Sequence, residues 1–124
     1  NKVWSATRTD MAMIGGITNG KKAMDLSDIG GLDCEIMSWG YTLVSVANLH
    51  LMLSSNNCSF YEQPLPYETF EFGMHDVLRT KKDGYMHAPT KPGLGVEINW
   101  DQMKTRVIHS FYCDKNKEVG LVHA

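Results

Sequence analysis

The order of apolar and polar positions in the first half of the chain alternates between two periods. Short segments rich in β-branched, aromatic and other apolar residues predict three strands, at Val3–Thr9, Asp33–Ser38 and Ser59–Glu62. Apolar residues at helical spacing predict a helix that Thr18 caps and that runs through residues 21–29. The same spacing predicts a second helix over Tyr41–Leu53. The predicted order is therefore strand, helix, strand, helix, strand.

This order is typical of βαβ units, in which the strands are parallel and the crossovers are right-handed. The three strand starts are about 26 to 30 residues apart, which is the spacing of such units. Three parallel strands cannot close a barrel, and an open sheet of this size leaves an apolar edge uncovered. We therefore expect the half-sheet to be incomplete, with further βα units upstream.

The second half of the chain has a different character. All four prolines lie between Pro64 and Pro92. A Lys-Asp-Gly-Tyr segment at residues 82–85 predicts a hairpin turn, and residues 95–100 predict a short edge strand. Asp101 is expected to cap a last, weak helix over residues 101–111.

Composition narrows the class of protein. The chain has 124 residues, 43% apolar and 21% charged, which suits one globular domain or a piece of a larger one. Twelve basic and fourteen acidic residues give a net charge of −2, which argues against a nucleic-acid binder. No apolar run is long enough to span a membrane. Three widely spaced cysteines without a CxxC motif indicate reduced thiols, and we expect a cytoplasmic protein.

The residues that end the predicted strands are the candidates for chemistry, because sites in parallel α/β folds lie at the carboxyl ends of strands. Asp10 follows the first strand, Met37-Ser38-Trp39 closes the second, and Glu62 ends the third. Each carboxylate also has a structural interpretation, Asp10 as a cap of a helix or turn and Glu62 as a salt-bridged strand terminus. His50 lies on an apolar helix face and is expected to be a packing residue.

Four segments carry a family resemblance: RTDMAMIGGIT, SWGYTLVSVANLHLML, FYEQPLPYETFEFG and DGYMHAPTKPGLGVEINWD. They resemble the carboxyl-terminal part of the mandelate racemase/muconate lactonizing branch of the enolase superfamily. The resemblance implies an α/β fold, a partial TIM-like (β/α)₇β barrel. Residues 1–66 would hold barrel strands six to eight, and residues 67–124 an irregular extension and return segment that packs on a capping domain.

The resemblance also implies a chemistry, the abstraction of the proton next to a carboxylate. Mg²⁺ would be held by three acids on strands that precede Asn1, so this chain contains none of the expected metal ligands. Asp10 matches the sixth-strand Asp that orients a His, and Glu62 matches an eighth-strand Glu that in some members donates a hydrogen bond to the substrate. Met37 takes the place of that His and cannot transfer a proton. Met37 and Trp39 are expected to contact the substrate.

These implications predict a Mg²⁺-dependent acid-sugar dehydratase, a hydro-lyase acting on a small-molecule carboxylate. A racemase or cycloisomerase of the same superfamily, or a non-catalytic homologue that lacks the His, stays open. The complete protein is expected to be a homo-oligomer that binds neither nucleic acid nor membrane, and this chain alone is expected to be inactive. Without an imidazole partner, Asp10 should bond to a backbone amide or to water, or pair with Arg8 or an upstream Lys.

Overall fold

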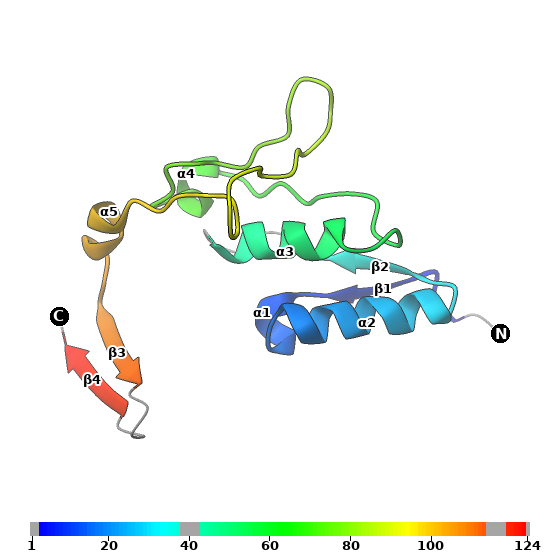
Figure 1. Ribbon diagram of the computed structural model, residues 1–124, viewed down its shortest axis with the longest axis horizontal. Helices are drawn as coiled ribbons and strands as arrows, with labels where there is room; N and C mark the ends of the chain where they lie inside the picture. Colours follow the sequence, from blue (N-terminus) through cyan, green and yellow to red (C-terminus); the bar gives the residue numbers. More distant parts are fainter. Residues whose placement is uncertain (1–2, 38–42, 114–118, 124) are drawn as a thin grey trace.

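The computed structural model describes residues 3–37, 43–113 and 119–123. In chain order, its elements are β1 (Ala6–Thr9), α1 (Met11–Ile14), α2 (Ile17–Ile29), β2 (Asp33–Ile36), α3 (Leu43–Leu53), α4 (Tyr67–Phe70), α5 (Trp100–Lys104), β3 (His109–Cys113) and β4 (Val119–His123). Figure 1 shows the first five elements gathered in one body, an extension that passes along α3, and the β3–β4 hairpin projecting away from both.

The body is built on two parallel strands, as the sequence predicts. β1 pairs with β2 in the register Ala6↔Asp33 to Thr9↔Ile36. Helices α2 and α3 cover one face of this sheet, where alternate residues of β2 are buried. The core consists of Met24, Cys34, Ile36, Leu51 and Met52. Residues of β2 on the opposite face, such as Glu35, are only partly buried.

Two glycines separate α1 from α2 at the predicted break. Gly15 (φ 87°) and Gly16 (φ 110°) have backbone conformations that favour glycine. Helix α2 starts directly after Gly16, which caps it without a side-chain hydrogen bond. The expectation that Thr18 caps this helix is therefore wrong, because Thr18 lies inside it. Helix α1 was not predicted, since four residues are too few to show a helical period.

The predicted strand at Ser59–Glu62 does not form. The chain approaches β2 just before this segment, where the Cys34 amide donates to the Asn57 carbonyl at 2.7 Å. Residues 59–62 themselves take no regular strand pairing. Strand structure depends on hydrogen bonds from neighbouring strands, which a local pattern of apolar residues cannot supply. The rest of the α/β interpretation holds without this strand.

The extension keeps the predicted turn but not the predicted elements around it. Residues 81–85 form a turn in which the Lys81 amide donates to the Tyr85 carbonyl at 3.0 Å. The edge strand expected at residues 95–100 is reduced to one isolated bridge, Met74↔Ile98. The helix expected over residues 101–111 is wrong beyond Lys104. Asn99, not Asp101, caps α5, and β3 begins at His109, inside the range expected to be helical, and pairs antiparallel with β4.

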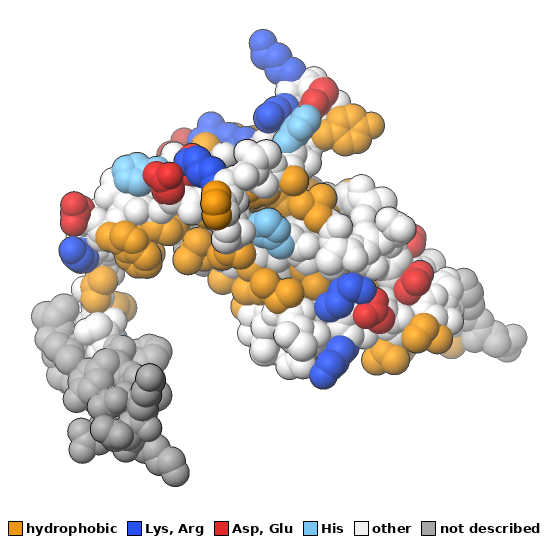
Figure 2. Space-filling view, in the orientation of Figure 1, with side chains coloured by type: hydrophobic (Ala, Val, Ile, Leu, Met, Phe, Trp, Pro, Cys, Tyr) orange, Lys and Arg blue, Asp and Glu red, His pale blue; other side chains and the backbone are white. Residues whose placement is uncertain are grey.

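The extension contacts the body through α3. The His50 ring nitrogen Nε2 lies 2.9 Å from the Leu94 carbonyl oxygen, so His50 holds the Pro-Gly loop of the extension on the helix. This agrees with its interpretation as a packing residue. Figure 2 shows apolar side chains along the hollowed side between the extension and the body. Large apolar side chains that are exposed include Trp4, Leu26, Leu65 and Trp100. In the part of the chain that the structure describes, no helix is long and apolar enough to cross a membrane.

Candidate functional site at the strand ends

The carboxyl ends of β1 and β2 lie side by side. The ladder continues one step past β2, because the Met37 amide donates to the Thr9 carbonyl at 2.9 Å. Asp10 follows Thr9 directly, so Asp10 and Met37 emerge from the same edge of the sheet. This is the edge at which parallel α/β proteins place their ligands. The structure thus brings together two of the predicted site residues.

Asp10 caps helix α1. Its side-chain oxygen Oδ1 accepts a hydrogen bond from the Ala12 amide at 2.6 Å, and its carbonyl accepts from the Ile14 amide at 3.0 Å. Such a cap satisfies an amide that the helix itself leaves without a partner. The expected bond to a backbone amide is therefore confirmed, and the capping interpretation of Asp10 holds. Asp10 is fixed in place by its own helix rather than by an imidazole.

Glu62 belongs to a charged cluster on the open face of the sheet. Arg8, in the middle of β1, donates from Nη2 to Glu62 Oε1 and places Nη1 3.7 Å from Glu35 Oε2. Arg8 and Glu35 are register partners in the β1–β2 ladder, so they lie on the same face. Glu62 is the most buried of the three, with 23% of its side chain exposed. Arg8 was expected only as a partner for Asp10, and the structure pairs it with Glu62 instead.

A hollow of about 410 Å³ adjoins this pair and is lined by Arg8, Glu62, Gln63, Pro64, Leu65 and Phe70. A guanidinium offers several N–H donors in a fixed fork that matches carboxylates. A neighbouring carboxylate accepts hydrogen bonds from hydroxyl groups. The combination is suited to a small ligand that carries both a carboxylate and hydroxyls, which is the chemistry of a hydroxy acid.

Asn48 is a buried polar residue that sequence reasoning missed. It lies in the middle of α3, fully buried, and its side chain bonds to both strand ends. Its Oδ1 accepts from the Met11 amide at 3.1 Å, and its Nδ2 donates to the Met37 carbonyl at 2.9 Å. The signal available in the sequence was an amide side chain inside an otherwise apolar helical run, LVSVANLHLML.

The remaining predictions fall outside this cluster. Trp39 lies outside the described residues. Among the residues that the structure does describe, no group of three or more His, Cys, Asp or Glu side chains is placed to hold a metal ion. These residues do not by themselves make a Mg²⁺ site.

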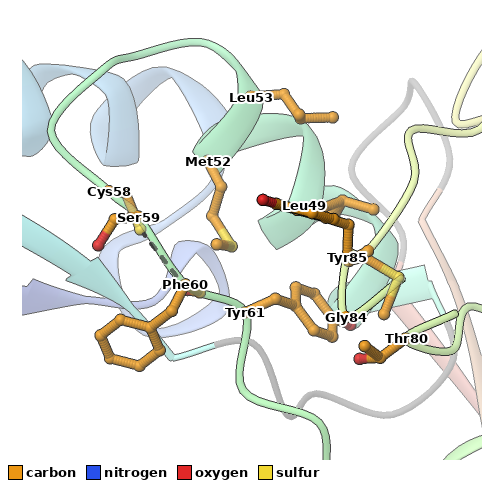
Figure 3. Close-up of a pocket in the computed structure, with 11 residues that line it drawn as sticks. Leu49, Met52, Leu53, Cys58, Ser59, Phe60, Tyr61, Thr80, Gly84 and Tyr85 are labelled. Atoms are coloured by element: carbon orange, nitrogen blue, oxygen red, sulfur yellow. Dashed lines mark hydrogen bonds between the residues drawn. The ribbon is translucent and has the colours of Figure 1, made fainter. Parts of the chain in front are cut away.

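A second hollow lies away from the strand ends, between α3 and the turn of the extension (Figure 3). Tyr61 and Tyr85 both line it, and Figure 3 shows them beside Leu49 of α3. Burial raises the pKa of the Tyr61 hydroxyl, and a hydrogen bond with Ser45 partly offsets the rise. Burial likewise raises the pKa of the Cys58 thiol. Residues of α3 and of the extension line this hollow together, so it marks where the extension packs on the body.

The parallel strands and the helices that cover them define an α/β protein. The sequence model described as "Enolase C-terminal domain-like" matches residues 2–102. The chain therefore belongs to the enolase C-terminal domain-like family, which confirms the resemblance noted from the sequence.

Similar proteins support this assignment. The chain is 34% identical over 108 residues to the D-galactonate dehydratase family member RspA of Pantoea ananatis, covering 80% of this chain and 24% of that protein. Among solved structures, a protein of Pseudovibrio sp. assigned to the mandelate racemase/muconate lactonizing enzymes matches with a TM-score of 0.81 and 39% identity, over 98% of this chain and 30% of its own.

A second solved structure is the D-glucarate dehydratase of Agrobacterium tumefaciens, complexed with magnesium. It matches with a TM-score of 0.67 and 30% identity, over 82% of this chain and 27% of its own. The chain thus spans about a quarter to a third of the length of the relatives that it matches.

Proposed function

We propose that the protein to which this chain belongs is an acid-sugar dehydratase of the enolase superfamily. The observation that carries the proposal is the Arg8–Glu62 pair on the face of the sheet beside the ends of β1 and β2. Two kinds of relative support the same substrate class, the D-galactonate dehydratase family members and the D-glucarate dehydratase. An acid sugar is a carboxylate with several hydroxyls, which is the kind of ligand that this pair is suited to bind.

In the proposed reaction, a 2,3-dihydroxy acid loses the proton on the carbon next to its carboxylate and the hydroxyl on the following carbon. The products are water and an enol, which tautomerises to a 2-keto-3-deoxy acid. In the proposed reaction, Arg8 and Glu62 bind the acid through its oxygen atoms and orient it. Asp10, Met37 and Trp39 would line the same site.

Mg²⁺ is part of the proposal, and its ligands would come from residues other than those that the structure describes. The D-glucarate dehydratase is a relative complexed with magnesium, and this supports the metal requirement. When bound, the ion would stabilise the negative charge that develops on the substrate carboxylate as the α-proton leaves. We also propose that residues 1–66 form the last part of a barrel and that residues 67–124 form its extension.

One observation favours a different function. Met37 occupies the strand end where the resemblance implies a His, and a thioether neither accepts nor delivers a proton. A non-catalytic homologue that keeps the fold and has lost turnover would carry such a change. The Arg8–Glu62 pair weighs against this alternative. If the two positions served only to pack the fold, a pair of apolar side chains would do so equally well.

The experiment that tests the proposal is a substrate screen of the purified full-length protein with Mg²⁺. A panel of aldonic and aldaric acids is incubated with the protein, and 2-keto-3-deoxy products are detected by semicarbazone formation. We expect at least one acid to give product. A racemase would give α-proton exchange in D₂O without a keto acid, and a non-catalytic homologue would give neither. Either of those results would overturn the dehydratase proposal.

A further inference from the structure

Two buried asparagines hold opposite ends of the sheet. Asn48 contacts the carboxyl ends of the strands, through the Met11 amide and the Met37 carbonyl. Asn57 contacts the other end, where its Nδ2 donates to the Met24 carbonyl at 3.0 Å and to the Leu32 carbonyl at 3.3 Å. Leu32 precedes the first residue of β2. The two side chains are alike in type and burial and differ in which end of the sheet they hold.

The bond to Met11 matters because of where Met11 lies. Met11 is the first residue of α1, and the first amides of a helix have no partner within it. Asp10 caps the next amide, that of Ala12. Asn48 supplies the partner that Met11 lacks, so the turn carrying Asp10 is held from both sides. An amide that loses its hydrogen-bond partner weakens the structure around it, so loss of the Asn48 side chain should loosen this turn.

The second bond extends the same constraint to the neighbouring strand. The Met37 carbonyl accepts from Asn48, and the Met37 amide is already bonded to Thr9. One side chain on α3 therefore fixes the Asp10–Met11 turn relative to Met37. The Asn48 side chain thus forms hydrogen bonds with backbone atoms just past both strands. These bonds set the spacing between the residues that follow β1 and those that follow β2.

We infer that Asn48 is a positioning residue, which sets the geometry of the strand-end site through Met11 and Met37 without contacting the substrate. This inference rests on the proposed function for its catalytic consequence. Misplacing a catalytic group by about 1 Å can cost about 10²-fold in rate. The corresponding asparagine at the far end, Asn57, should stabilise the fold without affecting turnover.

The test compares Asn48→Leu with Asn57→Leu in the full-length protein. Both substitutions remove an amide of similar volume from a buried place, so both should lower the midpoint of urea unfolding. Asn48→Leu should also lower kcat by about 10²-fold, with a much smaller change in KM. Asn57→Leu should leave kcat close to that of the wild type. Asn48→Asp, which keeps the oxygen that accepts from Met11, should recover part of the loss.

Hydrogen exchange separates this inference from the proposed function and needs no substrate. In the wild-type protein the Met11 amide should exchange as slowly as amides of the β1–β2 ladder. Asn48→Leu should speed exchange at Met11 and Ala12 roughly tenfold, and Asn57→Leu should not. Free exchange of the Met11 amide in the wild type, or equal losses of kcat in the two leucine variants, would overturn the inference. If no acid sugar is turned over, the exchange pattern still decides whether Asn48 holds the strand ends.

Discussion

Arg8 and Glu62 form an ion pair across 54 positions of the sequence. The pair joins the middle of β1 to the segment that follows α3, and Glu35 of β2 completes the cluster. An exposed ion pair of this kind contributes little to stability, about 0–1 kcal/mol. The pair lies beside the strand ends and lines a hollow, and this position supports the proposed binding of a ligand there.

The first prediction concerns the carboxylate of this pair. Glu62→Ala removes both side-chain oxygens of Glu62, of which Oε1 contacts Arg8 and either could contact a substrate hydroxyl, and should lower kcat by about 10²–10³-fold. Glu62→Gln keeps the shape and one acceptor oxygen for Arg8, so its effect should be milder. The rates are measured in the full-length protein on the best acid from the screen. Glu68→Gln, the same change at an exposed position of α4, serves as the control. Equal and negligible effects of both Glu62 variants would show that Glu62 is structural.

The second prediction concerns Met37. Met37→His places an imidazole one residue past β2, beside the strand end from which Asp10 emerges. A nearby carboxylate raises the pKa of an imidazole, so the new side chain would titrate close to neutral pH. We expect the full-length variant to gain or broaden proton exchange at the α-carbon of a hydroxy acid.

Deuterium wash-in followed by NMR measures this exchange, with Met37→Leu as the control of similar volume. The account is contradicted if a structure of Met37→His shows the imidazole against Asp10 and exchange is unchanged. A structure that shows the imidazole turned into the helix layer would instead disprove the alignment of Met37 with the missing His.

The third prediction concerns thiol reactivity. Burial raises the pKa of Cys58, and hydrogen bonds with the backbone of Ile36 and Phe60 offset only part of the rise. The thiolate is the reactive form, so Cys58 should react with iodoacetamide at pH 8 more slowly in the folded protein than in urea. Burial raises the folded pKa of Cys58 above the unfolded pKa, so the protonated thiol stabilises the fold fully below the unfolded pKa. This contribution is lost as the pH rises through the folded pKa. Mass spectrometry of the modified peptide follows the reaction. Equal rates at Cys58 with and without urea would contradict the burial of this thiol.

The fourth prediction concerns the contact between α2 and α3. A Cβ atom at Gly20 would lie 2.5 Å from Leu51 Cδ2, and Leu51 is fully buried. Gly20→Ala should therefore overpack the core at a cost of about 1–3 kcal/mol. The gain in helix propensity, about 1 kcal/mol, offsets only part of this cost. Urea unfolding of the full-length protein should show a lower midpoint than the wild type, whereas Lys22→Ala, at an exposed position of the same helix, should not. A raised midpoint for Gly20→Ala would show that the two helices are less closely packed than described.

The sequence was informative where structure is local. It predicted β2, α2 and their order from the pattern around Cys34 and Ile36 and from the glycines at 15 and 16. Alternation of apolar and polar residues and breaks between helices depend on residues that are neighbours in the sequence. The sequence failed where hydrogen-bond partners are distant. The strand expected at Ser59–Glu62 lacks regular pairing. The helix expected over residues 101–111 ends at Lys104, and β3, which pairs with the distant β4, begins at His109.

The candidate site divides in the same way. Asp10 and Met37 were found because each follows a strand in the sequence, and parallel strands end at one edge. The partner of Glu62 was not found, since Arg8 lies inside a strand and its direction depends on the register between β1 and β2. Asn48 was missed because one polar residue in an apolar helix does not reveal which backbone atoms it will meet.

The most direct test of the account is a crystal structure of the full-length protein with a bound, unreactive acid sugar. The account predicts that oxygen atoms of the sugar lie within hydrogen-bond distance of the Arg8 guanidinium and the Glu62 carboxylate, at the edge where Asp10 and Met37 emerge. An acid sugar bound elsewhere, with the Arg8–Glu62 pair intact and without contact to the ligand, would contradict it.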